Sequence, residues 1–67
     1  MKVTLNGESY DLTPDTTLVS FLQKLGQSPK PGTAVAVNQE VIPAAEWAEH
    51  LLNDGDTILL IQATQGG

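Results

Sequence analysis

The sequence predicts an α+β domain in which one main helix packs on a mixed four- to five-stranded sheet. Two segments near the ends of the chain, Met1–Leu5 and Thr57–Ala63, have the apolar and β-branched character of strands. Residues 18–25 carry apolar side chains at helical spacing, and a further alternating segment follows at Thr33–Asn38. With 67 residues the chain has room for one domain.

The first strand and its return are expected to form a hairpin. Apolar and polar residues alternate over Met1–Leu5, which is the period-two pattern of a half-buried strand. The dipeptide Asn6-Gly7 follows, and it tolerates the positive φ angles of a two-residue hairpin turn. We therefore expect a short antiparallel strand at Ser9–Leu12.

The main helix is expected to begin after Thr17. Its hydroxyl can act as an N-cap by accepting a hydrogen bond from an amide one turn later. The apolar side chains that follow lie at i, i+3, i+4 and i+7 and form one stripe: Leu18, Phe21, Leu22 and Leu25. Gly26 suits the left-handed conformation that ends a helix, and the prolines within residues 28–32 preclude regular structure.

The second half of the chain is expected to complete the sheet. Residues 33–38 predict a strand and residues 41–42 a brief edge strand. A short helical segment is predicted over residues 43–52 because Pro43 suits a first helical position. A tight turn at residues 53–56 then leads into the last strand, Thr57–Ala63.

This order of elements favours one topology. When a hairpin comes first, a helix second and the remaining strands last, the first strand is expected to pair with the last strand in the middle of the sheet. This is a β-grasp arrangement. Residues 64–67 contain nothing that can pack. We therefore expect a domain over residues 1–63 and a flexible tail over residues 64–67 that ends in Gly66-Gly67.

Composition excludes several classes of function. Eight acidic residues against three lysines give a formal net charge of −5, which would repel nucleic acid. The absence of cysteine rules out disulfides, thiolate metal sites and thiol chemistry. The apolar runs are far shorter than a membrane span and no leader pattern opens the chain, so we expect a cytoplasmic protein away from membranes. The acidity suits docking on a basic partner, and equally suits simple solubility.

The side chains that could carry chemistry form no catalytic constellation. His50 is the only histidine and lies in the predicted second helical segment without a ligand set beside it. Glu46 and Glu49 are expected to be neighbours on that helix, and Asp54 and Asp56 to belong to a turn; neither pair supplies the ligands that calcium requires. We expect no metal, no bound cofactor and no enzymatic activity of the chain's own.

The Gly66-Gly67 terminus suggests a chemical role. A tail without Cβ atoms can be threaded into a narrow active site, where its ionised carboxylate can attack the α-phosphate of ATP. A sulfur nucleophile that displaces AMP would leave a thiocarboxylate on Gly67. The alternative is an inert, frayed tail.

The last strand suggests a docking surface. If Ile58 and Leu60 pack beneath the helix, Leu59 and Ile61 lie with Ala36 on the open face of the sheet, near the start of the tail. These three residues then form an apolar patch for a partner. Alternatively, they serve only strand propensity.

Several motifs, in their order and spacing, resemble the ThiS family of sulfur carriers in thiamine biosynthesis over essentially the whole chain. They are Val-Asn-Gln-Glu-Val-Ile-Pro over residues 37–43, Trp47, Asp54-Gly55-Asp56 before an apolar strand, and Gly66-Gly67. The resemblance implies a ubiquitin-like β-grasp fold. It carries Gly67 over as the modified residue and Gly66 as the flexible residue before it. Trp47 and the Asn38-Gln39 turn match as family features, to which we assign only structural roles.

The resemblance also implies two successive partners, an adenylating enzyme and a thiazole synthase, and we expect a sulfur donor protein beside them. An adenylating enzyme of the ThiF type uses ATP and magnesium to activate the terminus, a sulfur donor protein supplies the sulfur, and a thiazole synthase of the ThiG type accepts it. The alternatives are the small subunit of molybdopterin synthase, a ubiquitin-like modifier passed to lysines, and a non-catalytic β-grasp interaction domain. The pre-tail of the molybdopterin subunit usually contains prolines, and residues 62–65 contain none.

Overall fold

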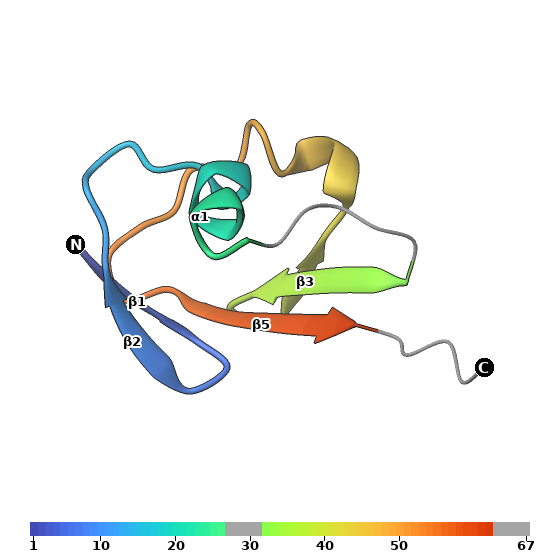
Figure 1. The fold of residues 1–67 in the computed structure, drawn as a ribbon, viewed down its shortest axis with the longest axis horizontal. Coiled ribbons are helices and arrows are strands. Elements are labelled where there is room, and N and C mark those ends of the chain that lie inside the picture. Colours follow the sequence, from blue (N-terminus) through green and yellow to red (C-terminus); the bar gives the residue numbers. More distant parts are fainter. Residues whose placement is uncertain (27–31, 63–67) are drawn as a thin grey trace.

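The computed structural model describes residues 1–26 and 32–62, and within them a five-stranded sheet carries one α-helix on one face (Figure 1). The elements in chain order are β1 (Lys2–Leu5), β2 (Glu8–Asp11), α1 (Leu18–Lys24), β3 (Thr33–Val37), β4 (Glu40–Ile42), the 3₁₀ helix η1 (Ala44–Glu46) and β5 (Thr57–Gln62). The strands lie in the order β2-β1-β5-β3-β4. The last strand therefore lies beside the first in the middle of the sheet, and the expected β-grasp arrangement is confirmed.

The β1–β2 hairpin follows from its turn dipeptide. Asn6 and Gly7 have φ angles of 50° and 86°, the left-handed conformation that a two-residue turn requires. Leu5 pairs directly with Glu8, so β2 begins one residue before the predicted Ser9. The hairpin is confirmed, and the strand boundary shifts because only two residues form the turn.

β5 pairs differently with its two neighbours. It runs parallel to β1 for two residue pairs, of which the last is Leu5 opposite Ile58. It runs antiparallel to β3 over five pairs, of which the last is Thr33 opposite Gln62. Strand-to-strand pairing therefore holds one edge of β5 along almost its whole length and the other edge only near its start.

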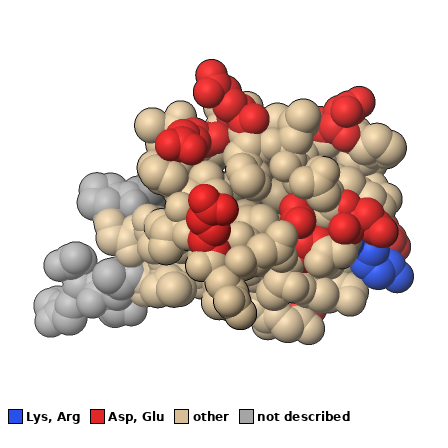
Figure 2. All heavy atoms as spheres, turned by 180° about the vertical axis from the view of Figure 1, so that it is seen from behind, with Lys and Arg blue, Asp and Glu red and all other residues tan. Residues whose placement is uncertain are grey.

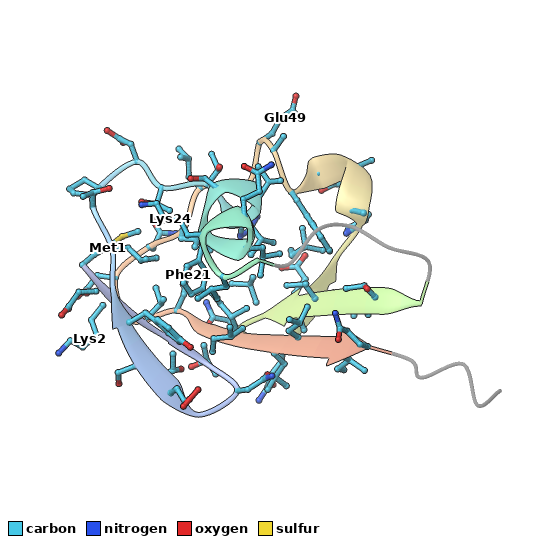
Figure 3. The ribbon with its side chains drawn as sticks, viewed as in Figure 1. Met1, Lys2, Phe21, Lys24 and Glu49 are labelled. Atoms are coloured by element: carbon cyan, nitrogen blue, oxygen red, sulfur yellow. The ribbon has the colours of Figure 1, made fainter. Side chains whose placement is uncertain are left out.

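The helix begins where the sequence predicts it. Thr17 is the N-cap, and its hydroxyl accepts a hydrogen bond from the Ser20 N–H at 3.2 Å. The apolar stripe faces the sheet: Phe21 points from α1 toward the strands (Figure 3), where its ring meets that of Tyr10 edge-on at a centroid distance of 5.4 Å. Gly26, with a φ angle of 77°, follows the end of the helix as expected.

The predicted helical segment over residues 43–52 is largely wrong. Only η1 is helical there, as a single 3₁₀ turn. The carbonyls of Trp47 and His50 instead accept hydrogen bonds from the N–H groups of Val19 and Leu18, at 3.1 and 2.8 Å. The first N–H groups of a helix have no partner within it. The segment satisfies those groups of α1 and so does not continue as a helix itself.

The core is one cluster of apolar side chains between α1 and the sheet. Its members are Val3, Leu5, Leu18, Phe21, Leu22, Val35, Val37, Ile42, Trp47, Leu52 and Ile58. Trp47 is the largest fully buried side chain, and its Nε1–H donates to the carbonyl of Ile42 at 2.8 Å. This indole joins β4 to the segment that follows it, which is a structural role.

Trp47→Phe is expected to lower the free energy of unfolding by about 2–3 kcal/mol, because it removes buried apolar volume and leaves the buried Ile42 carbonyl without its donor. Urea unfolding followed by far-UV circular dichroism measures the change. A loss below about 0.5 kcal/mol, the range of a neutral surface substitution, would contradict the anchoring role of the indole.

Candidate functional site

The side chains first considered for catalysis do not assemble into a site. His50 lies half-buried in the loop after η1, so its predicted place in a helix is wrong. Glu46 belongs to η1 and Glu49 lies beyond it, where its side chain points away from the domain (Figure 3). Within residues 1–26 and 32–62, no three His, Cys, Asp or Glu side chains gather in a group that could hold a metal ion.

The two aspartates of the Asp-Gly-Asp turn are used by the fold. Asp54 accepts a hydrogen bond from the backbone N–H of Lys2 at 2.7 Å. Asp56 is buried, and its two oxygens accept from the Asn38 side-chain amide at 2.9 Å and from the backbone N–H of Asn53 at 2.8 Å. These carboxylates tie the turn to β1 and to the β3–β4 turn, as the prediction of a turn role requires.

β5 presents different side chains to its two faces. Ile58 is fully buried and Leu60 is half-buried against the core beneath α1. Leu59 and Ile61 point to the opposite face and are 46% and 58% exposed. The predicted alternation along this strand is confirmed.

The opposite face of the sheet carries an apolar surface. Strand pairing places Ala36 between Leu59 on β5 and Val41 on β4. Val41 is 66% exposed, whereas Ala36 is only 9% exposed, so the predicted patch residue Ala36 contributes little surface of its own. We call Ala36, Val41, Leu59 and Ile61 the open-face patch; α1 lies on the other side of the sheet (Figure 1). Sequence reasoning missed Val41, although its alternation with the buried Ile42 could have placed it there.

A shallow hollow adjoins the open-face patch. It has a volume of about 320 Å³ and is lined by Asn38, Gln39, Thr57 and Leu59. The first two of these residues form the turn between β3 and β4, with φ angles of 51° and 73°. The surface beside the patch is therefore not flat, and the hollow can accept a side chain of a partner.

Negative charge dominates the ionised groups of the surface. Carboxylates are spread over the face seen in Figure 2, while basic groups are confined to its edge. Lys2 lies 3.9 Å from Asp11 in an exposed pair. The open-face patch contains no ionisable side chain. No helix in the described part of the chain has the length and apolar character to cross a membrane.

The structure places the root of the predicted tail but not its end. β5 ends at Gln62, and Gly66 and Gly67 lie outside the described residues, so their role stays a prediction. Near the end of β5, the Asn6 side chain forms two hydrogen bonds with the backbone of Leu60, at 2.9 and 3.3 Å. The last described residues of β5 therefore lie beside the open-face patch and directly precede the segment that bears the candidate carboxylate.

Comparison with known sequences gives consistent matches. The model of the ThiS family matches residues 3–67. The chain is similar to the sulfur carrier protein ThiS of Escherichia coli (strain K12), with 36% identity over 67 residues that cover the whole of both proteins.

Two further matches concern a longer protein and a solved structure. The chain is 31% identical over 67 residues to a thiazole synthase of Paramagnetospirillum magneticum (strain ATCC 700264 / AMB-1), of which it covers 20%. The crystal structure of the thiamine biosynthesis protein ThiS from Geobacter metallireducens matches with a TM-score of 0.82 over 100% of both chains, at 22% identity. At that identity the structural match supports the fold, which is the ubiquitin-like β-grasp.

Proposed function

The chain belongs to the ThiS family, and on that premise we propose that it is a sulfur carrier whose terminal Gly67 is converted to a thiocarboxylate that donates sulfur for thiazole formation in thiamine biosynthesis. The observation that carries this proposal is the full-length similarity to the E. coli sulfur carrier protein. In this role the chain is a protein substrate that other enzymes charge and discharge.

The chemistry has two steps. A carboxylate oxygen of Gly67 attacks the α-phosphorus of ATP, pyrophosphate leaves, and an acyl-adenylate forms. A sulfide equivalent then attacks the acyl carbon, AMP leaves with the bridging oxygen, and the thiocarboxylate remains. Sulfur delivered as sulfide needs no redox partner, whereas the terminal sulfur of a protein persulfide requires a thiol reductant to supply two electrons.

The first partner is an adenylating enzyme of the ThiF type. In this proposal it supplies the ATP site and the magnesium ion that neutralises the phosphates. We propose that this enzyme docks on the open-face patch, because the patch is apolar and includes β5 residues, and because Val41, Leu59 and Ile61 are exposed in it. Docking there holds the globular body while the glycine tail enters the active site.

The second partner is a thiazole synthase. A protein named thiazole synthase contains a segment that is similar to the whole of this chain, so in that protein a carrier-like segment is part of the same polypeptide. Such a covalent association supports thiazole formation as the destination of the sulfur, in preference to molybdopterin assembly. A separate sulfur donor protein charges the carrier in this scheme.

Intact-mass spectrometry tests the proposal directly. The carrier is incubated with the adenylating enzyme, ATP, Mg²⁺ and sulfide, and an identical reaction without ATP is the control. We expect a mass gain of one oxygen-to-sulfur exchange, localised to Gly67 by fragmentation, in the complete reaction alone.

Other masses would lead to other conclusions. An unchanged mass in the complete reaction would contradict the carrier function and favour an interaction domain. Adducts on lysines of other proteins would instead identify a ubiquitin-like modifier. Sulfur transfer from the charged protein to molybdopterin synthase, but not to thiazole synthase, would overturn the thiazole assignment alone.

A further inference from the structure

Two asparagines hold β5 at its opposite ends. Asn6 and Asn38 each begin a tight turn, with φ angles of 50° and 51°. The side-chain oxygen Oδ1 of Asn38 accepts a hydrogen bond from the N–H of Thr57, the first residue of β5, at 3.0 Å. The Asn6 side chain bonds Leu60, close to the other end of the strand. The turns of both hairpins therefore contribute a side chain to the same central strand.

The Asn6 amide takes the place of a missing rung of the parallel ladder. The backbone N–H groups of Thr4 and Asn6 donate to the carbonyls of Asp56 and Ile58, both at 3.0 Å. Beyond this point β1 turns away into its hairpin. The Asn6 side chain then accepts from the Leu60 N–H at 2.9 Å and donates to the Leu60 carbonyl at 3.3 Å, as a peptide group would.

This pair of bonds acts where the pairing of β5 is one-sided. Backbone groups of alternate residues in a strand point to opposite edges. The N–H and the carbonyl of Leu60 point away from β3, so the β3–β5 hydrogen bonds do not include them. The backbone pairing of β1 with β5 ends at Ile58. The hydrogen bonds of the Asn6 side chain therefore extend the contacts along the β1-side edge of β5 by two residues, up to Leu60.

The position of Leu60 matters for the tail. Gly67 follows Leu60 by seven residues, which span at most about 25 Å when extended. A partner that docks on the open-face patch holds the body, and the direction in which β5 leaves the sheet then decides where the last carboxylate can reach. Misplacing a reacting group by about 1 Å can cost on the order of 100-fold in rate.

We propose that Asn6 is a positioning residue for the C-terminal tail: by bonding both backbone groups of Leu60, its side-chain amide holds the β1-side edge of β5 two residues before the strand ends at Gln62, and so sets the direction in which the chain continues toward the adenylating site. The proposal rests on the carrier function proposed above. Asn6 takes no part in the chemistry and is not expected to contribute to docking affinity.

Two matched variants separate positioning from stability. Asn6→Gly and Asn38→Gly both keep the positive φ angle of the turn, because glycine adopts it freely, and both remove side-chain hydrogen bonds to β5. Asn38→Gly also deprives the buried Asp56 of a donor, so it is the more disruptive of the two for the fold. It leaves the bonds at Leu60 intact.

The carriers are compared in ATP–pyrophosphate exchange by the adenylating enzyme, at a temperature where circular dichroism shows every variant folded. For Asn6→Gly we expect kcat to fall roughly tenfold with little change in KM for the carrier, because docking is kept and positioning is lost. Amide hydrogen exchange at Leu60 should quicken in the free protein. Because the Asn38 side chain also lines the hollow beside the open-face patch, any loss in Asn38→Gly should fall on KM and not on kcat. Trp47→Phe changes a core side chain away from the patch and the tail, so it is the destabilised control and should keep its kcat.

The outcomes distinguish this inference from the function on which it rests. No exchange with the wild-type carrier would overturn the proposed function, and the positioning role with it. Exchange with the wild type and an unchanged kcat for Asn6→Gly would overturn the positioning role alone. An equal fall in kcat for Asn6→Gly and for the destabilised control would show that the effect comes from lost stability. That result would also overturn the positioning role.

Discussion

Adding one residue after Gly67, or deleting Gly67, is expected to abolish thiocarboxylate formation, a loss of more than about 100-fold in rate. The reacting carboxylate must meet the α-phosphate of ATP within a near-attack distance. An added residue moves the carboxylate past that point and places an amide where the nucleophile was. A deleted residue leaves the carboxylate short by about 3.5 Å.

The same variants should leave the fold unchanged. The core cluster is made by residues that precede the tail, from Val3 to Ile58, so the free energy of unfolding should stay within about 0.5 kcal/mol of the wild type. Intact-mass spectrometry after incubation with the adenylating enzyme, ATP and sulfide reports the chemistry, and urea unfolding reports the stability.

A change inside the tail is the matched control. Gln65→Ala alters the tail without moving its end, and should be charged at nearly the wild-type rate. Full charging of the extended protein would show that the terminal carboxylate is not the reacting group. Failure of Gln65→Ala together with the extension would instead show that the sequence of the tail, and not its length, is what the partner requires.

Local sequence chemistry was sufficient for the first half of the fold. Asn6-Gly7 dictates its hairpin because of backbone sterics, and Thr17 caps α1 because of its hydroxyl; both were predicted and both are confirmed. The alternation along β5 was likewise enough to assign Ile58 to the core and Leu59 to the open face. Each of these features depends on residues that are neighbours in the sequence.

Features that depend on distant partners were not predictable in the same way. Residues 43–52 were predicted to be helical from Pro43, but the carbonyls of Trp47 and His50 bond the start of α1, which lies far away in the sequence. The bonds from Asn6 to Leu60 join residues 54 apart. Local patterns contain no information about such pairings.

The candidate site was likewise predictable only where it depends on local sequence. Gly67 was singled out by the chemistry of a glycine terminus and by family resemblance, and its place lies outside the described residues. The open-face patch was predicted in part from alternation, and strand pairing extended it to Val41. Its role as a docking surface stays a prediction, which a charge substitution can test.

Leu59→Asp is expected to weaken binding to the adenylating enzyme by about 2–4 kcal/mol, or roughly 30- to 1000-fold in Kd. The side chain lies near the middle of the open-face patch, opposite Ala36 and beside the hollow. A partner that covers this surface would have to bury an unpaired carboxylate, which costs far more than the lost apolar contact. Isothermal titration calorimetry with the adenylating enzyme measures the change.

Leu51→Asp is the matched control for this prediction. Leu51 is 53% exposed, close to the 46% of Leu59, but it bridges to Thr17 at the start of α1, on the helix side of the sheet. Because neither leucine belongs to the core cluster, both variants should lose less than about 1 kcal/mol of stability. Only Leu59→Asp should lose affinity. If the two variants bind the adenylating enzyme with equal affinity, the docking surface lies elsewhere. The carboxylate introduced at Leu59 would in that case stay exposed to water in the complex.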